Sequence, residues 1–360
     1  MIIGKSTNGK WIHMALAVII AGACVTHFFG VQGEIHLRAD KAQTLTVKPS
    51  VLSRQHAVSL FLWDFQVVYT EDGQTPVDYI TELRLLDREG NDTQASDPLS
   101  PLTVDEGTMR MNKPLKYHGF RFCQSDYDSD MQGVVLNYNY DPWGIGITYT
   151  GYALLLLAMI GFFFRKNTHF RATLHRLTDN WSRRGVAVMF SSLGLFIIVM
   201  AAVMTHVVTP KPPLQPVLQT PLLGIHVSVI MLAYTLFAVI MVNGITGLCS
   251  KRVSPIVLHL SQVLLYPAVF CLAAGIFIGA VWANLSWGRY WGWDPKETWA
   301  LITMLVYALM LHLPFIRNKF HWKDDTYRTV YHICSIVAFL FVLFTYFGVN
   351  RLLGGLHSYA

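Results

Sequence analysis

Seven runs of mainly apolar residues, each about as long as a bilayer is thick, limit what this chain can fold into. A helix that crosses the hydrocarbon core needs about 20 such residues, and lipid admits only helices and closed barrels as spanning structures. The runs cover residues 11–29, 145–164, 185–208, 224–248, 255–281, 299–316 and 329–348. Charged residues make up only 14% of the chain. We therefore expect a polytopic α-helical membrane protein with about seven spans.

The first run could be read as a secretory signal peptide. It lacks a small-residue cleavage site and ends in the bulky sequence His27-Phe28-Phe29, so we expect an uncleaved anchor.

The basic residues between the runs indicate an orientation, since Lys and Arg collect in cytoplasmic loops. Three segments rich in these residues are 165–184, 249–254 and 317–328. With seven alternating spans they share one side with Lys5 and Lys10, so we expect that side to be the cytoplasm. These loops also account for the net charge of +6, and the sequence gives no indication of nucleic-acid binding. The segments expected to face outward are 30–144, 209–223, 282–298 and the C-terminus.

The outward segment 30–144 is polar and contains strand patterns. Runs rich in aromatic and β-branched residues occur at 58–62, 64–69, 79–86 and 133–138, and turn residues separate them. We expect a β-rich domain between spans 1 and 2. Among the five cysteines only Cys123 falls in this domain, and none forms a CxxC pair, so no disulfide framework is indicated.

The segment 282–299, WANLSWGRYWGWDPKETW, has five tryptophans and a tyrosine within 18 residues. Tryptophans commonly form belts at membrane interfaces, but this density, together with Gly288 and Gly292, also suits a platform for a large planar ligand. Both interpretations stay open at this point. Asp294 and Glu297 are placed to cap the following helix. They could also carry protons, whereas Arg289 and Lys296 could pair with carboxylates of a ligand or extend to the interface.

Histidines at matching depths suggest metal ligation, since imidazole is a common haem iron ligand and is rare inside spans. His226 and His357 lie on the outward side with the tryptophan-rich segment 282–299. His13 and His312 lie near the cytoplasmic side, where His259 and His332 are alternatives. For each of these residues alone, an interfacial or packing role is the competing interpretation.

Particular strings in the second half resemble a known family. WGRYWGWDPKETWALI at 287–302 is similar to the WWD signature of haem-handling proteins, which include the CcsA/ResC proteins of System II cytochrome c biogenesis. TPLLGIHVSVIMLAY at 220–234 and FTYFGVNRLLGGLHSYA at 344–360 look like the same family.

The first half resembles the partner family, CcsB/ResB. The similar stretches are HMALAVIIAGACVTHFFG at 13–30, MRMNKPLKYHGFRFCQSDYD at 109–128 and DPWGIGITYTGYALLLL at 141–157. The resemblance implies a CcsB/ResB-like part at 1–164, a basic cytoplasmic linker at 165–184 and a CcsA/ResC-like domain at 185–360 with its WWD loop at 282–298. CcsB proteins usually have several spans before their soluble domain, whereas this chain has one, so a further CcsB-type subunit is an expected partner.

The resemblance also implies site residues. His226 and His357 would ligate the iron of haem b at the outer face and act as the catalytic pair. His13 and His312 would ligate haem iron at a second site within the membrane, which favours His312 over the alternatives at its depth. The cofactor would also contact Trp287, Trp291, Trp293 and Asp294.

The implied activity is that of a holocytochrome c synthase-type haem lyase in the bacterial inner membrane. It would translocate haem and attach it by thioether bonds to CxxCH motifs of apocytochrome c, with thiol-reducing thioredoxin-like proteins as further partners. Cys123 could serve as a thiol relay, but we expect a packed domain cysteine. The alternatives for the whole chain are a haem exporter that performs no attachment and a membrane scaffold whose tryptophans form only a belt.

Overall fold

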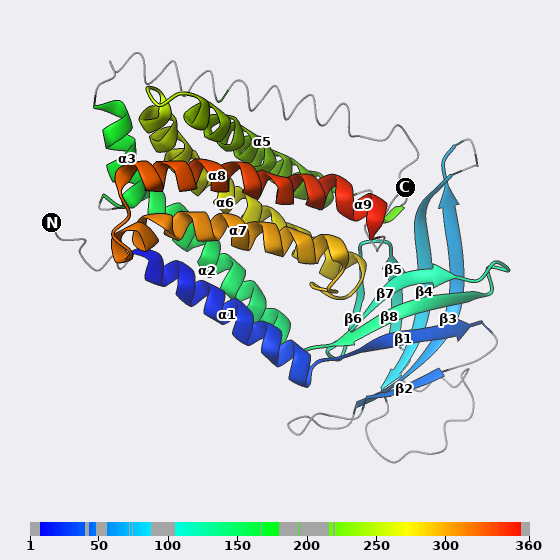
Figure 1. Ribbon diagram of the computed structural model, residues 1–360. Helices are drawn as coiled ribbons and strands as arrows, with labels where there is room; N and C mark the ends of the chain where they lie inside the picture. The colour runs from blue at the N-terminus through cyan, green and yellow to red at the C-terminus, as the bar shows by residue number, and fades with distance from the viewer. Residues whose placement is uncertain are drawn as a thin grey trace.

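The computed structural model describes residues 8–39, 43–47, 56–87 without 72 and 74, 105–179 without 167, residue 194, 216–218 and 220–353. A helix bundle and a β domain make up this part of the chain, with the β domain at one end of the bundle (Figure 1). We call this end of the bundle the domain end and the opposite end the far end.

Six helical segments in the described residues are long and apolar enough to cross a membrane. They confirm six of the predicted runs, and the predicted span at 185–208 lies outside the described residues. The long helices are α1 (Asn8–Phe29), α2 (Gly144–Phe164), α5 (Pro221–Cys249), α6 (Ser254–Ser286), α7 (Pro295–Lys319) and α8 (Asp324–Leu343). Shorter helical elements are α3 (His169–Thr178), η1 (Pro216–Leu218), η2 (Phe344–Gly348) and α9 (Val349–Leu352).

The bundle core forms where α5, α6, α7 and α8 meet. Large side chains are fully buried there, among them Phe237 and Tyr307, whose rings stack with centroids 3.6 Å apart. Helices that lie in lipid gain little from apolar burial between themselves, so close packing of this kind is what holds them together.

The predicted β-rich domain is confirmed as two four-stranded antiparallel sheets. One sheet has the order β1-β8-β7-β6, with strands Val31–Arg38, Gly133–Tyr140, Phe120–Tyr127 and Leu115–Tyr117. The other has the order β2-β3-β4-β5, with strands Gln43–Val47, His56–Tyr69, Pro76–Asp87 and Asp105–Arg110. Alternate residues of both sheets, such as Leu37, Leu60 and Leu83, are buried between them, as the two-residue period of strands requires.

One detail of the strand prediction was wrong. The runs at 58–62 and 64–69 belong to a single strand, β3, because a register shift between Leu62 and Asp64 carries the strand past Trp63. A β-bulge places one extra residue in a strand and so interrupts the alternation that a sequence pattern relies on.

The β domain is inserted between two helices that are themselves paired. Strands β1 and β8 pair in register from Val31 and Tyr140 onward, directly beyond the ends of α1 and α2. The two helices pack so closely that a Cβ at Gly22 would clash with Oγ1 of Thr148. The antiparallel packing of α1 with α2 in the bundle therefore continues directly as the pairing of β1 with β8 in the sheet.

Candidate functional site

The tryptophan loop, which we define as residues 287–294, joins α6 to α7 at the domain end. Trp287 stacks edge-on against Trp282 with ring centroids 4.8 Å apart. Trp291 packs on the bundle core, and its ring is 5.9 Å from that of Trp293 at 89°. Only Trp293 among these projects outward, with 71% of its surface exposed. The loop is thus a folded cluster with one projecting indole, which a simple row of interfacial anchors would not produce.

Trp293 is held in a left-handed backbone conformation, with φ of 55°, which costs a bulky residue energy and marks positions worth inspecting for function. The carboxylate of Glu297 stabilises this backbone conformation by bonding to the residues before and after Trp293. One carboxylate oxygen of Glu297 accepts from the backbone N–H of Gly292 at 2.8 Å and of Asp294 at 3.3 Å. The side chain of Asp294 accepts from Lys296 N at 2.9 Å and from the backbone N–H of Glu297. The latter bond and the Glu297 bond to Asp294 N form a capping box at the start of α7. The capping interpretation of both carboxylates is therefore confirmed.

The loop rests on the β domain. Asn139 of β8 donates from Nδ2 to the carbonyl oxygen of Gly288 at 2.8 Å, and Ser286 donates to Oδ1 of Asn112 at 2.5 Å. Gly288 itself has φ of 77°, and a Cβ there would lie 3.2 Å from Sγ of Cys123. These contacts fix the backbone of the loop against the sheet β1-β8-β7-β6.

Cys123 is buried beneath the loop, with 2% of its surface exposed. Burial raises the pKa of its thiol to about 12. Because the thiolate is the reactive form of cysteine, a thiol of this kind is inert near neutral pH. The structure supports the packing role that we expected for Cys123.

A chain of hydroxyl groups ties the loop to the first two helices. Tyr290 donates to Oγ1 of Thr26 at 2.9 Å, and Thr26 donates to Oδ2 of Asp141 at 2.5 Å. Thr148 of α2 donates to the same Tyr290 hydroxyl at 3.4 Å. The other oxygen of Asp141 accepts from Gly144 N at 2.7 Å, at the start of α2. The sequence analysis missed this chain, because no local spacing indicates a contact across 264 residues.

His13 of α1 and His312 of α7 are neighbours, as their common depth predicted. Their ring centroids are 6.0 Å apart and the ring planes meet at 80°. In each, Nδ1 bonds to the carbonyl oxygen four residues earlier, at 2.6 Å to Gly9 and 2.7 Å to Ala308. Since a carbonyl only accepts, each proton lies on Nδ1 and the lone pair on Nε2, the arrangement of a metal-binding imidazole.

The centroid separation of 6.0 Å places the two imidazoles close enough to contact one ligand together.

The alternatives at this depth lie elsewhere. His332 is buried, with 1% of its surface exposed, and its Nε2 lies 3.0 Å from Oγ of Ser254. It packs so tightly on α5 that a Cβ at Gly247 would clash with the imidazole of His332. His259 of α6 lies near His169 of α3. His312 is therefore the histidine whose ring neighbours that of His13, and the joint ligand role of the two stays a prediction.

At the domain end, His226 occupies the first turns of α5. Its Nδ1 bonds to the carbonyl oxygen of Gly275 in α6 at 2.7 Å, which again assigns the lone pair to Nε2. A Cβ at Gly279 would lie 2.6 Å from the imidazole, so α6 is shaped to admit this ring. His357, the predicted partner of His226, lies outside the described residues.

These features define a class of protein: a multi-span membrane protein in which a β sandwich, inserted between two helices, supports a tryptophan-rich loop. The chain belongs to the Cytochrome C assembly protein family, whose model matches residues 148–357. The ResB-like family matches residues 10–144. The two matches meet at the start of α2, so two families that the sequence strings had indicated are joined in one chain.

Curated relatives agree. The protein NrfI of Wolinella succinogenes is 35% identical over 236 residues, which cover 58% of this chain and 26% of NrfI. The cytochrome c biogenesis protein CcsA of Chlamydomonas reinhardtii is 38% identical over 159 residues, 41% of this chain and 43% of that protein. CcsA of Trachelium caeruleum is 49% identical over 88 residues, 24% of this chain and 26% of its own. The matched part of this chain thus spans about a quarter to two fifths of the relatives' length.

Proposed function

We propose that this protein acts in cytochrome c biogenesis as a membrane-bound haem lyase that presents haem and promotes its attachment to the CxxCH motif of apocytochrome c. The seating of the tryptophan loop on the β domain is the observation that favours attachment over simple export. Asn139 and Cys123 of the sheet contact the loop directly at Gly288. A polypeptide held by the β domain would therefore lie close to a ligand held by the loop.

The proposed orientation places the far end in the cytoplasm of a bacterium and the β domain in the periplasm. The loops at the far end contain Lys251, Arg252 and Lys323, and the last turn of α7 adds Arg317 and Lys319. This agrees with the enrichment of Lys and Arg in cytoplasmic loops. The imidazole pair of His13 and His312 would accordingly receive haem b on the cytoplasmic side.

At the domain end, His226 and His357 are the proposed iron ligands, with Trp287, Trp291 and Trp293 as the surface for the ring system. Haem would supply its iron for axial ligation and its vinyl groups for thioether formation. Asp294 contributes indirectly, because its side chain caps α7 and fixes the loop. The exposed indole of Trp293 offers a flat apolar face on which a porphyrin could stack.

The attachment reaction makes limited demands on this chain. Each acceptor thiol adds across a vinyl double bond, so that sulfur bonds to one carbon and the proton goes to the other, with no net change in oxidation state. The contribution of the protein is to position the reactants and exclude other reactions. Cys123 has no part in it, since its thiol stays protonated near neutral pH.

Two partners follow from this chemistry and from the chain itself. The acceptor cysteines must be thiols before they can add, so a thiol-reducing thioredoxin-like protein would supply them. A further CcsB-type subunit is the second proposed partner, in line with the ResB-like match at residues 10–144.

Co-expression with a secreted CxxCH acceptor tests the proposed function. The expected result is an acceptor whose haem survives acid-acetone extraction, together with a Soret band in the purified membrane protein. A Soret band without any covalently labelled acceptor would identify an exporter instead. If protein purified from haem-replete cells showed no haem absorption band, the tryptophans would be interpreted as an interfacial belt and not as a haem site.

A further inference from the structure

One face of the sheet β1-β8-β7-β6 is turned toward the helix bundle. Cys123 and Asn139 on this face contact the end of α6 and the tryptophan loop. Side chains alternate along a strand, so Arg121, two residues before Cys123, points the same way. The register pairs Lys116 with Arg121, and Arg121 with Asn139. A row of three polar side chains, two of them cationic, therefore faces the bundle.

Two like charges directly opposite each other on one sheet face destabilise the pair. Neither Lys116 nor Arg121 forms an ion pair with a carboxylate of the described residues. The guanidinium of Arg121 lies near the hydroxyl group of Tyr149. Its Nη1 atom is buried and has no hydrogen-bond partner in the described part of the chain. Arg121 as a whole is partly buried, and a buried guanidinium nitrogen without an acceptor is unfavourable.

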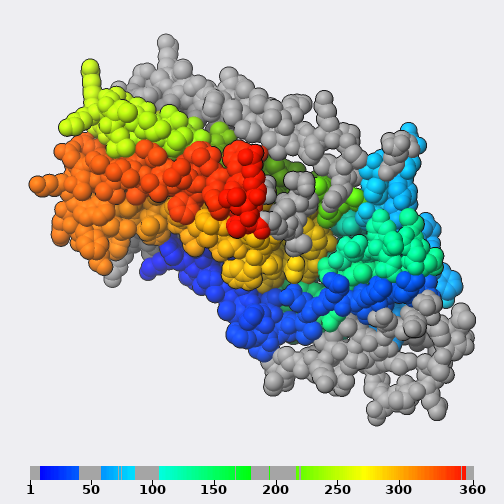
Figure 2. Space-filling model, turned by 45° about the vertical axis from the view of Figure 1, so that its right-hand side comes forward, coloured from blue at the N-terminus to red at the C-terminus, as the bar shows by residue number. Residues whose placement is uncertain are grey.

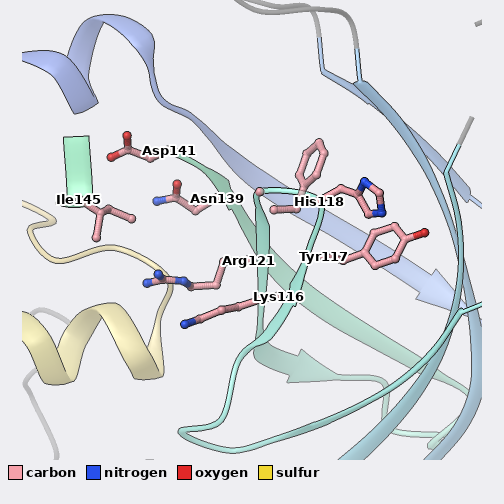
Figure 3. A pocket seen from close by; sticks show the side chains of 9 residues that line it. Lys116, Tyr117, His118, Arg121, Asn139, Asp141 and Ile145 are labelled. Atoms are coloured by element: carbon pink, nitrogen blue, oxygen red, sulfur yellow. The ribbon is translucent and has the colours of Figure 1, made fainter. Parts of the chain in front are cut away.

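Both cations line a cleft of about 260 Å³ between the β6–β7 hairpin, Asn139 of β8 and Ile145 of α2. Figure 3 shows that Lys116 and Arg121 extend to the same side, toward the end of the bundle. Asp141 also lines the cleft, but its two oxygens accept from Thr26 and from the backbone of Gly144. This carboxylate is therefore held at the start of α2 and makes no ion pair with Lys116 or Arg121.

We propose that this cleft binds an oxyanion, a carboxylate or a phosphate, through Lys116 and Arg121. A planar guanidinium beside an ammonium group suits such a ligand, because guanidinium nitrogens bind two oxygens at once. An anion between the two side chains would convert their repulsion into two attractive contacts.

The position of the cleft admits two sources of this chemistry. It lies where the apolar helix α2 begins, and the neighbouring Trp143 is 72% exposed, as at the headgroup level of a bilayer. Figure 2 shows the β domain beside the end of the bundle, where lipid headgroups would lie. A phospholipid phosphate would therefore reach the cleft. The second source is a haem propionate, which rests on the proposed function, because the sheet face with Lys116 and Arg121 also contacts the tryptophan loop.

Thermal unfolding of the full chain in non-ionic detergent tests the site with matched probes. Phosphatidylglycerol is compared with a phosphate-free glycolipid of the same acyl chains, and haem with its dimethyl ester. We expect one anionic probe to raise the unfolding midpoint of the unaltered chain by several degrees more than its uncharged counterpart. Lys116→Gln and Arg121→Gln should each abolish that difference. Lys113→Gln, at an exposed cation of the same region that does not line the cleft, should preserve it.

A second measurement does not require the ligand to be identified, because it depends only on the direction in which the unfolding midpoint changes. In chain purified with its native lipids, Lys116→Gln should lower the midpoint if an anion is bound, and raise it if two cations merely repel. If Arg121→Gln does not fold, the Lys116→Gln variant alone tests the site, because Lys116 is exposed. The proposed site would be wrong if the unfolding midpoint shifted equally with the charged and the uncharged member of both probe pairs. It would also be wrong if the difference between the members persisted in both Lys116→Gln and Arg121→Gln. Absence of a Soret band would refute the proposed function, while the lipid pair would still decide the oxyanion site.

Discussion

The hydroxyl group of Tyr290 in the tryptophan loop lies 2.9 Å from Oγ1 of Thr26 in the first helix, and this hydrogen bond joins the two family segments of the chain. Thr26 passes the connection on to Asp141, which caps the start of α2. The loop that we propose to hold haem is therefore positioned by the ResB-like segment as well as by its own helices. Fusion of the two segments keeps both ends of this hydrogen-bond chain in one polypeptide.

Tyr290→Phe should lower the free energy of unfolding by about 1–3 kcal/mol, because it leaves the buried hydroxyl of Thr148 without its acceptor and removes a donor to Thr26. Denaturant or thermal unfolding in detergent measures the loss. Tyr346→Phe is the control, since the ring of Tyr346 packs on Tyr234 and Phe347 and its hydroxyl makes no hydrogen bond to the described residues. We also expect a shifted Soret band in Tyr290→Phe alone. Equal stability in the two variants would show that the chain of hydroxyls is dispensable.

Replacement of either member of the imidazole pair should remove a bound haem at the far end. His13→Gly and His312→Gly should each reduce the haem retained on purification, and added imidazole should restore it, since a small ligand can enter the space left by the ring. His321→Gly, an exposed histidine after α7, is the control. Optical spectra of oxidised and reduced protein provide the measurement. Unchanged haem content in both pair variants would rule out this pair as iron ligands.

Glu297→Ala should release the backbone of Trp293. The carboxylate accepts from the residues on both sides of this strained tryptophan, so its loss should cost about 1–2 kcal/mol, the range for a helix cap. We expect the fluorescence of Trp293, obtained as a difference from a Trp293→Phe variant, to change in parallel. Lys296→Ala in the same turn keeps the capping box and serves as the comparison. A Trp293 signal that is identical in both backgrounds would contradict the role given to Glu297.

Cys123 should resist alkylation in the folded protein at pH 8 and react only after unfolding, because burial raises the pKa of the thiol from 9.0 to about 12. The stability that follows from this shift is complete below pH 9. It is lost as the pH rises from 9 toward 12, because the unfolded thiol ionises first. A chain with Cys123 as its sole cysteine isolates the reaction. Rapid modification of folded protein at pH 8 would show that the thiol is accessible and ionised.

Much of the fold could be predicted from the sequence, because membrane spans depend on the composition of continuous segments. The run at 145–164 matches α2 almost completely. The run at 299–316 lies inside α7, which extends a few residues further at both ends. The pairing of His13 with His312 was also predictable, since alternating spans fix which residues share a depth. The preference for His312 over His259 and His332 needed the family resemblance. The ring of His312 does neighbour that of His13, while its role as an iron ligand stays a prediction.

The contacts between the segments could not be predicted in this way. Asn139 with Gly288, and Lys116 opposite Arg121, depend on strand register and on how a sheet docks against a bundle. Neither quantity leaves a periodic trace in the sequence. The bulge at Trp63 was missed for a related reason, because one extra residue makes a single strand look like two. The predicted ligand His357 and the span at 185–208 lie outside the described residues and stay predictions.

The pairing of β1 with β8 has a consequence for the order in which the chain can fold. Val31 finds its partner only when Tyr140 is available, so the first helix and strand must wait until more than a hundred residues have followed. Closing so long a loop costs conformational entropy, and contacts of this kind therefore form slowly. Once Tyr140 is paired, however, α2 starts within a few residues, directly beside α1. Completion of the sheet and insertion of the second span are thus coupled events during biosynthesis, and a block to either should stall both.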